Sequence, residues 1–225
     1  ESSKDVLIHG VTGSGKTEVF IELIKKEIKE NKQTLLLVPE ITLTLFLTSR
    51  LKTIFGEEVV FIHSNLTDQE YNNYYNKIKN NEAKVIIGTR SSIFMPFNNL
   101  GKIIVDEEHD TSYKNNTEPF YHVRDVISFW KKQKNIQVIY ASATPSLESY
   151  ARAKKGVYEL VEMKKRYSQN PLPNIDLEVV QDYDQLFAAN TLLKINEAFK
   201  RDEKVVILYN KKGFASSVEC KNCNH

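Results

Sequence analysis

The chain has 225 residues, of which 41% are hydrophobic and 27% are charged, a composition typical of a soluble globular protein with one large core or two smaller ones. Its 31 basic and 29 acidic residues leave a formal net charge of +2, which does not by itself indicate a nucleic-acid binder, so any DNA or RNA site is expected to be local. No apolar stretch approaches about 18 residues and no leading segment resembles a signal, so we expect a cytoplasmic protein with no membrane partner.

Short β-rich apolar runs alternate with helical segments over the first two thirds of the chain. Six of these runs are predicted strands: Val6–His9, Leu35–Val38, Val59–His63, Val85–Gly88, Ile103–Val105 and Gln137–Ala141. Between them, Thr17–Glu30 has the apolar spacing of a helix, and Thr67 with Glu70 forms a capping box that opens another helix. This alternation predicts an α/β fold, a parallel sheet flanked by helices, over residues 1–154, with an active site at the carboxyl ends of the strands.

A glycine-rich segment follows the first predicted strand and matches the pattern G-x-x-x-x-G-K-[ST] at Gly10, Val11, Thr12, Gly13, Ser14, Gly15, Lys16 and Thr17. A strand that ends in glycines and turns into a helix leaves several backbone N–H groups converging on one point, where the helix dipole also favours an anion. We therefore expect the polyphosphate of ATP here, with Lys16 reaching the β- and γ-phosphates and the Thr17 hydroxyl binding Mg²⁺. A chance glycine turn is the alternative, and the flanking strand and helix argue against it.

An acidic tetrapeptide, Asp106-Glu107-Glu108-His109, follows the strand Ile103–Val105. Asp106 is predicted to hold Mg²⁺ through its water shell, and Glu107 is the predicted catalytic base that orients and deprotonates the attacking water. A solvated acidic turn is the alternative, but the phosphate loop earlier in the chain favours a hydrolytic site, in which Lys16 also acts.

His109 ends this tetrapeptide and has two interpretations, as a metal or acid–base group or as a structural link. We expect it to form a hydrogen bond with Ser142 or Thr144, which follow the strand Gln137–Ala141. Such a bond would couple the state of the nucleotide to another side of the domain.

Five segments, including the one that contains the acidic tetrapeptide, carry acidic, small or hydroxyl residues at or near the ends of predicted strands. They are Leu37–Thr44 (LVPEITLT), Gly88–Phe94 (GTRSSIF), Asp106–Asp110 (DEEHD), Ser142–Glu148 (SATPSLE) and Asn210–Ala215 (NKKGFA). Together with the phosphate loop, they resemble the motor core of superfamily 2 helicases, and more closely the primosomal protein N′ family of bacterial replication-restart DNA helicases.

That resemblance implies a RecA-like P-loop NTPase lobe in residues 1–154 and a linker with the truncated start of a second RecA-like lobe in residues 155–225. It implies a motor that uses ATP and Mg²⁺ to move 3′ to 5′ on single-stranded and forked DNA, with Thr89 and Arg90 among its DNA contacts. The expected protein partners are single-stranded DNA-binding protein and other primosome proteins. The resemblance also implies that the chain is a fragment, with the arginine finger of the second lobe outside it and with little hydrolytic activity of its own.

Aromatic residues are concentrated in the predicted loop that follows the acidic tetrapeptide. The candidates for DNA contact there are Tyr113, Phe120, Tyr121 and Arg124. Aromatic rings on a loop can stack on unpaired bases of any sequence, and Arg124 is expected either to contact a phosphate or to pair with Asp125. The alternative is that these aromatic side chains form a local core under the loop.

The pattern changes after residue 154. Val157–Met163 and Ile175–Val180 are predicted strands separated by a proline-bearing linker. A predicted helix, Thr191–Lys200, and a predicted strand, Val205–Tyr209, follow them. We therefore expect a second structural unit to begin here.

The two cysteines of the chain, Cys220 and Cys223, form a C-x₂-C pair. A structural zinc site needs about four ligands, usually two such pairs, so this pair is either half of a Zn²⁺ site or accidental. The family resemblance implies that it begins a zinc-binding insertion in the second lobe. His225 is either a third ligand or simply solvated.

Two other function classes share the phosphate loop. A small-molecule phosphotransferase would need a basic lid and an acceptor pocket, for which the sequence offers no segment. A non-catalytic nucleotide- or DNA-binding module is the third class, and stimulation of ATP hydrolysis by single-stranded DNA would separate the motor from both.

Overall fold

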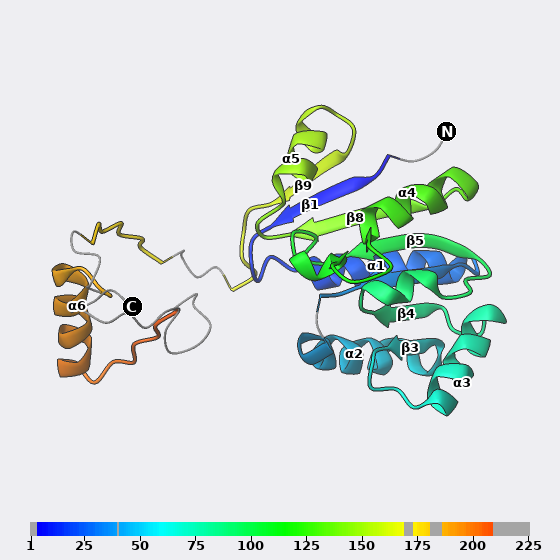
Figure 1. Cartoon of the computed structure of the whole chain (residues 1–225), viewed down its shortest axis with the longest axis horizontal. Helices are drawn as coiled ribbons and strands as arrows, with labels where there is room; N and C mark the ends of the chain where they lie inside the picture. Colours follow the sequence, from blue (N-terminus) through cyan, green and yellow to red (C-terminus); the bar gives the residue numbers. More distant parts are fainter. Residues whose placement is uncertain (1–3, 40, 169–172, 181–185, 209–225) are drawn as a thin grey trace, which may run out of the picture. The chain divides into compact units, whose positions relative to one another are not determined.

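The computed structural model describes residues 4–39, 41–168, 173–180 and 186–208, and it describes the side chains of all of these except 41–46. The chain forms two compact units, Glu1–Asn170 and Pro171–His225, each of which is described by itself. The helices and several of the strands are labelled in Figure 1.

The first unit is built on a seven-stranded sheet with the order β3-β4-β2-β5-β8-β1-β9, in which every neighbouring pair is parallel (Figure 1). Its strands are β1 Val6–Gly10, β2 Gln33–Leu37, β3 Val59–Ile62, β4 Val85–Gly88, β5 Leu100–Val105, β8 Gln137–Ser142 and β9 Glu159–Met163. The six strands expected in residues 1–154 are therefore confirmed, and so is the parallel sheet.

Helices cover both faces of this sheet. They are α1 Lys16–Lys29, α2 Ile41–Phe55, α3 Asp68–Lys79, α4 Val123–Gln133 and α5 Leu147–Lys154. Adjacent strand residues point to opposite faces, so Leu7 packs in one core cluster and Ile8 in the other. The cluster of Ile8 takes in residues of α1 and α2, and the cluster of Leu7 takes in residues of α3, α4 and α5. Burial on both faces explains why these strands read as continuous apolar runs.

Short elements connect the strands and helices of the first unit. The described residues include three 3₁₀ turns, η1 Gly56–Glu58, η2 Arg90–Phe94 and η3 Thr111–Tyr113. A two-stranded antiparallel ladder, β6 Lys114–Asn115 with β7 Tyr121–His122, follows η3. The predicted capping box is present at α3, where the Glu70 N–H donates to the Thr67 hydroxyl and the Thr67 N–H donates to the Glu70 carboxylate.

The predicted boundary near residue 154 is wrong. The strand β9 pairs in parallel with β1, with Val6 opposite Glu159 and Gly10 opposite Met163, so it belongs to the first sheet. A short strand gains its hydrogen bonds only from a neighbour, and β1 lies at the open edge of the six expected strands. The first unit therefore continues to Asn170.

The second unit contains one described helix, α6 Ala189–Lys200, close to the helix predicted at Thr191–Lys200. The strands predicted at Ile175–Val180 and Val205–Tyr209 are not formed over residues 175–180 and 205–208. Leu177 is 95% exposed and Val206 is 93% exposed, so these apolar segments have no sheet neighbour within the described part of this unit. That this unit is the start of a second RecA-like lobe stays a prediction.

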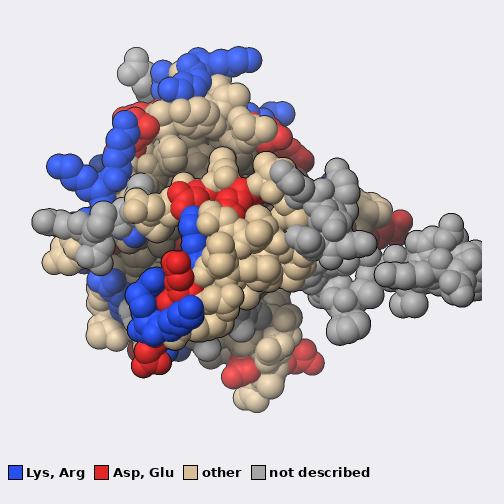
Figure 2. Space-filling model, turned by 90° about the vertical axis from the view of Figure 1, so that its left-hand side faces the viewer, with Lys and Arg blue, Asp and Glu red and all other residues tan. Residues whose placement is uncertain are grey.

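Among the described helices, none combines the length and the apolar character needed to cross a membrane. On the face of the molecule in Figure 2, basic and acidic side chains are interspersed with uncharged ones. This distribution agrees with the small net charge of +2.

Candidate nucleotide-binding and hydrolysis site

The phosphate loop connects β1 to the N-terminus of α1. Gly13 and Gly15 have φ angles of 77° and 92°, in the left-handed region that glycine adopts without strain, and Gly15 caps α1. A Cβ atom at Gly10 would lie 2.8 Å from the Ser14 Oγ atom and 3.0 Å from the Lys16 Cγ atom, so Gly10 lets the loop fold closely over the lysine. These three glycines give the loop its shape, which turns backbone N–H groups toward the helix N-terminus.

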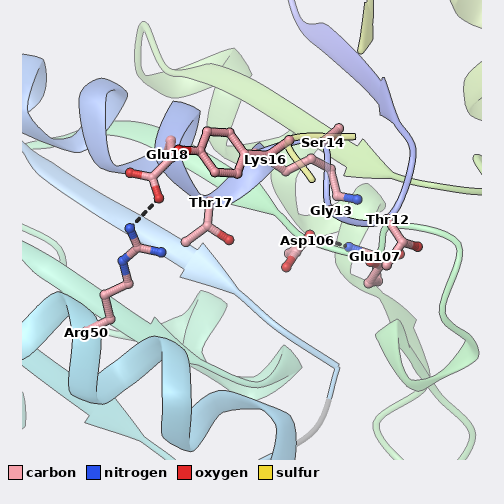
Figure 3. Close-up of a pocket in the computed structure, with 11 residues that line it drawn as sticks. Thr12, Gly13, Ser14, Lys16, Thr17, Glu18, Arg50, Asp106 and Glu107 are labelled. Atoms are coloured by element: carbon pink, nitrogen blue, oxygen red, sulfur yellow. Dashed lines mark hydrogen bonds and ion pairs between the residues drawn. The ribbon is translucent and has the colours of Figure 1, made fainter. Parts of the chain in front are cut away.

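A pocket of about 740 Å³ lies at this loop (Figure 3). It is lined by Thr12, Gly13, Ser14, Gly15, Lys16, Thr17, Glu18, Arg50, Asp106, Glu107 and Tyr167. Its volume falls in the range of about 300–1,000 Å³ found for small-molecule sites. The pocket therefore brings the phosphate loop together with the two acidic residues predicted to complete the site, 90 residues later in the chain.

Lys16 lies across the loop that precedes it. Its Nζ atom donates a hydrogen bond of 2.9 Å to the Gly10 carbonyl, which holds the ammonium group within the pocket. Thr17 follows it on the first turn of α1, where its hydroxyl lies on the same side as Asp106 (Figure 3).

Asp106 and Glu107 begin the turn after β5. The Asp106 N–H donates to the Leu37 carbonyl at 2.9 Å, which extends the ladder between β5 and β2 by one bond and fixes the start of the turn. Burial of Asp106 and the neighbouring charge of Glu107 raise the pKa of the Asp106 carboxyl to about 6. A half-buried carboxyl with a raised pKa in a cleft is typical of a functional site.

The backbone of Glu107 is strained. Its φ angle of 45° lies in the left-handed region, which costs a residue with a side chain about 1–3 kcal/mol. The turn is held by two bonds, from the Glu107 N–H to Asp106 Oδ1 at 3.0 Å and from the Asp110 N–H to the Glu107 carbonyl at 2.8 Å. Strain of this kind persists at functional sites because the surrounding structure imposes it.

The oxygen atoms of this pocket fit Mg²⁺. The Asp106 carboxylate and the Thr17 hydroxyl are hard oxygen ligands, and both line the pocket beside Lys16. Mg²⁺ is usually held by one or two such ligands together with phosphate oxygens and water. Among the described residues there is no group of three or more His, Cys, Asp and Glu side chains that would hold a metal by themselves.

His109 links the acidic turn to the end of β8. Its Nδ1 atom lies 2.8 Å from the Ser142 Oγ atom, so the hydrogen bond expected from the sequence is present. The Ser142 hydroxyl lies 3.4 Å from Glu107 Oε2 and accepts a 2.9 Å bond from the Thr144 N–H. The predicted base is thus connected through one serine to His109 and to the turn that follows β8.

Glu108 is a residue that the sequence analysis left without a role. Its side chain is 1% exposed and forms an ion pair of 2.8 Å with Arg124 Nη2 on α4. It also accepts bonds from the Ser146 N–H at 2.7 Å and from the Ser149 hydroxyl at 2.8 Å, at the start of α5. Glu108 therefore ties the acidic turn to both α4 and α5.

Replacing Glu108 by Ala should lower the free energy of unfolding by about 3–5 kcal/mol, because it leaves the Arg124 guanidinium, 15% exposed, without its buried partner. Urea denaturation of the 225-residue chain measures this difference. The matched control is Glu148→Ala, which removes an exposed carboxylate from α5 and should change stability little. Equal, small effects of the two substitutions would contradict the role given to Glu108.

Two of the predicted DNA-contacting residues bond to residues of the acidic turn. Tyr113 is 1% exposed, and its hydroxyl donates a 2.6 Å bond to the Asp106 carbonyl. Arg124 pairs with Glu108 and not with Asp125. The buried Tyr113 ring is therefore not available to stack on a base, and the expected pairing of Arg124 with Asp125 is wrong, because both residues support the acidic turn. A phosphate contact by Arg124 stays a prediction.

Arg90 also braces the loop that follows the acidic turn. Its Nη1 atom donates to the Ser112 carbonyl at 3.1 Å and to the Lys114 carbonyl at 3.2 Å. Thr89 precedes it as the N-cap residue of η2, and the side chains of Thr89 and Arg90 are both partly exposed. A DNA contact by Thr89 and Arg90 stays a prediction.

Exposed aromatic side chains do occur beside this loop. Phe120 is 69% exposed, and Tyr121 is half-buried with its ring 5.1 Å from that of Phe94 in an edge-to-face arrangement. Phe94, on η2, is 56% exposed and was not among the candidates. Its sequence signal was a large aromatic residue in a polar strand-end segment.

The predicted zinc ligands, Cys220 and Cys223, lie outside the described residues, as does His225. Zinc binding by this chain stays a prediction.

The phosphate loop after β1, the acidic turn after β5 and the serine at the end of β8 that bonds to this turn together have the arrangement of a P-loop nucleotide-binding domain of the helicase type. Comparison with known protein families matches residues 1–153 to the DEAD/DEAH box helicase family, and the chain belongs to that family.

Among individual proteins, the chain is 40% identical over its whole length to the replication restart protein PriA of Bacillus subtilis, of which it covers 29%. It is likewise 40% identical to the replication restart protein PriA of Chlamydia trachomatis, of which it covers 31%. The resemblance to primosomal protein N′ is therefore confirmed, and the chain spans less than a third of the length of these two relatives.

Solved structures support the same fold. A structure of RecG bound to a three-way DNA junction has 26% identity and a TM-score of 0.53, over 71% of this chain and 20% of that one. The Hef helicase domain of Pyrococcus furiosus has 20% identity and a TM-score of 0.56, over 75% of this chain and 37% of that one, and shows the fold alone. The first unit is a RecA-like lobe, as expected.

Proposed function

We propose that this chain is the ATP-binding lobe of a DNA helicase that acts in replication restart, and that a second lobe completes the motor; the longer protein is called the two-lobe protein below. The observation that carries the proposal is the meeting of the phosphate loop and the acidic turn in one pocket, with the turn hydrogen-bonded to the end of β8. The similarity to replication restart proteins supports the biological role, and movement 3′ to 5′ along single-stranded DNA is part of the proposal.

The proposed chemistry divides the pocket into binding and reacting groups. Backbone N–H groups of residues 13–17 and the Lys16 ammonium hold the β- and γ-phosphates, while Thr17 and Asp106 are positioned to hold Mg²⁺. When bound there, Mg²⁺ would neutralise negative charge that develops on the phosphates. Glu107 then orients a water in line with the γ-phosphate and accepts its proton.

Coupling to DNA is proposed to run through the serine link. A change in the position of Glu107 alters its contact with Ser142, and Ser142 is bonded to His109 and to the Thr144 N–H. The acidic turn is also bonded to Tyr113, which lies in the loop that follows it, and through Glu108 to Arg124 on α4. The same hydrogen-bonded residues therefore contact both the nucleotide site and the elements that carry the proposed DNA surface.

The test is an ATP hydrolysis assay of the two-lobe protein during titration with single-stranded DNA. The proposal expects the rate to rise with DNA and to saturate. A rate that is independent of DNA would favour a phosphotransferase, and an absence of hydrolysis under all conditions would favour a nucleotide-dependent binding module. A second titration with forked DNA tests the proposed preference for replication forks.

Replacing Phe120 and Tyr121 together by Ala should weaken DNA binding by about 1–3 kcal/mol per stacked base while leaving DNA-independent hydrolysis close to normal. The reason is that these side chains lie at the surface of the loop and not in the nucleotide pocket. The measurement is the DNA concentration that gives half-maximal stimulation in the two-lobe protein. Phe129→Ala, which removes a 59% exposed ring from α4, is the control, and a parallel loss of basal and stimulated rates would mean that Phe120 and Tyr121 are packing residues.

A further inference from the structure

The segment that follows β9 is anchored to the phosphate loop at two points. The Val11 N–H donates to the Met163 carbonyl at 3.1 Å, and the Tyr167 N–H donates to the Gly13 carbonyl at 2.9 Å. Residues 163–167 therefore run alongside the loop, and the second bond fixes the backbone of Tyr167 next to the point where the phosphates are proposed to bind.

The Tyr167 side chain is free of the protein core. It is 93% exposed and nevertheless lines the nucleotide pocket, together with Glu18 of α1 and Arg50 of α2. Glu18 and Arg50 form an ion pair with each other (Figure 3). Among the described residues that line this pocket, Tyr167 is the only aromatic one. The pocket therefore combines the polar groups of the phosphate loop with one flat aromatic ring beside them.

A ring placed in this way has a use when a nucleotide is bound. Leaving an aromatic side chain almost fully exposed forgoes the free energy of burying its apolar surface, which a stacked ligand ring would restore. Aromatic rings stack on bases by their π-faces, and such stacking contributes to binding without selecting a particular hydrogen-bonding pattern.

We infer that Tyr167 is the base-binding residue of this chain: its ring stacks on the base of the nucleoside triphosphate whose phosphates occupy the loop. The inference rests on the proposed nucleotide-binding function and names a residue that the sequence analysis did not single out. The ligand class is a nucleoside triphosphate with a purine base, because the larger purine ring offers more surface for stacking than a pyrimidine.

The test compares a ligand that has a base with one that lacks it. Binding of ATP and of inorganic tripolyphosphate, each with Mg²⁺, is measured by isothermal titration calorimetry on the 225-residue chain and its variants. Tyr167→Ala should raise the Kd of ATP by about 5- to 150-fold, the factor that corresponds to the stacking contribution of one base, and should leave the Kd of tripolyphosphate unchanged. Tyr167→Phe, which keeps the ring, should bind both ligands like the wild type.

Two controls separate this inference from the function on which it rests. Tyr75→Ala removes a 39% exposed tyrosine from α3, away from the pocket lining, and should change neither Kd. Lys16→Ala should lose both ligands. If Tyr167→Ala binds ATP as tightly as the wild type while Lys16→Ala loses it, the inference is wrong and the nucleotide site stands. If Tyr167→Ala weakens ATP and tripolyphosphate equally, Tyr167 only supports the loop, which also overturns the inference.

Discussion

Replacing Glu107 by Gln should lower the rate of ATP hydrolysis in the two-lobe protein by about 10²- to 10⁴-fold while leaving ATP affinity close to that of the wild type. Glutamine keeps the size of the side chain and a hydrogen-bonding oxygen, but its amide does not accept a proton from water. Glu107 lines the pocket opposite the phosphate loop and is held in its strained backbone conformation by the surrounding turn, so the substitution should not displace it.

Lys16→Ala is the complementary change. Lys16 supplies positive charge to the bound phosphates in the ground state, so its loss should abolish binding and with it hydrolysis. Turnover is measured by phosphate release and affinity by calorimetry, in both variants and in a Glu57→Gln control, whose carboxylate is exposed on η1. Normal turnover by Glu107→Gln would remove Glu107 from the role of general base, and unchanged ATP affinity in Lys16→Ala would remove the phosphate loop from nucleotide binding.

The predictable part of this structure is the part encoded locally. The phosphate loop is specified by glycines at three fixed positions and by the lysine and threonine that follow, and the structure has the backbone angles that this pattern requires. The six strands were predictable because a strand buried on both faces is a continuous apolar run. The meeting of the acidic turn with the loop followed from the rule that parallel strands share a carboxyl edge.

The rest depends on pairing and burial between distant segments. Residues 159–163 looked like a strand, but their partner, β1, lies more than 150 residues earlier, and only the pairing shows that they belong to the first unit. The strands expected in residues 175–180 and 205–208 had the right composition and found no neighbour in the described part of the chain. Apolar patterning shows that a segment can form a strand, whereas a neighbouring strand decides whether it does.

The loop that follows the acidic turn shows that the burial of a side chain also depends on residues distant in sequence. Tyr113, Phe120 and Tyr121 are all aromatic residues in a polar loop, yet Tyr113 is buried under the acidic turn and Phe120 is exposed. The difference is that the Asp106 carbonyl, at the end of β5, needs a donor, and the Tyr113 hydroxyl reaches it. Glu108 and Arg124 form a comparable hidden support, in which a buried carboxylate is satisfied by one guanidinium and by donors on α5. In both places the acidic turn is shaped by polar contacts that involve residues far apart in sequence.

The 225-residue chain alone should hydrolyse ATP at least about 10³-fold more slowly than the two-lobe protein, with or without single-stranded DNA, because a trans-acting arginine at such sites typically contributes about 10³ to 10⁵ in rate. The described side chains that line the pocket include two cations, Lys16 and Arg50. Lys16 is placed to hold the phosphates in the ground state, and Arg50 is paired with Glu18. Neither is therefore positioned to stabilise the charge that appears on the γ-phosphate only as the bond breaks.

The measurement is steady-state phosphate release by the chain and by the two-lobe protein at the same ATP concentration, combined with calorimetry to show that the chain binds ATP. Binding without turnover is the expected result, since the phosphate loop is made from local backbone while the transition-state cation is proposed to come from the second lobe. Adding an arginine-free second lobe should leave the slow rate unchanged, which ties the deficit to that one cation and not to closure of the site. Turnover by the 225-residue chain near that of the two-lobe protein would mean that Arg50 leaves Glu18 and acts on the γ-phosphate from within the lobe, and Arg50→Lys would then abolish it.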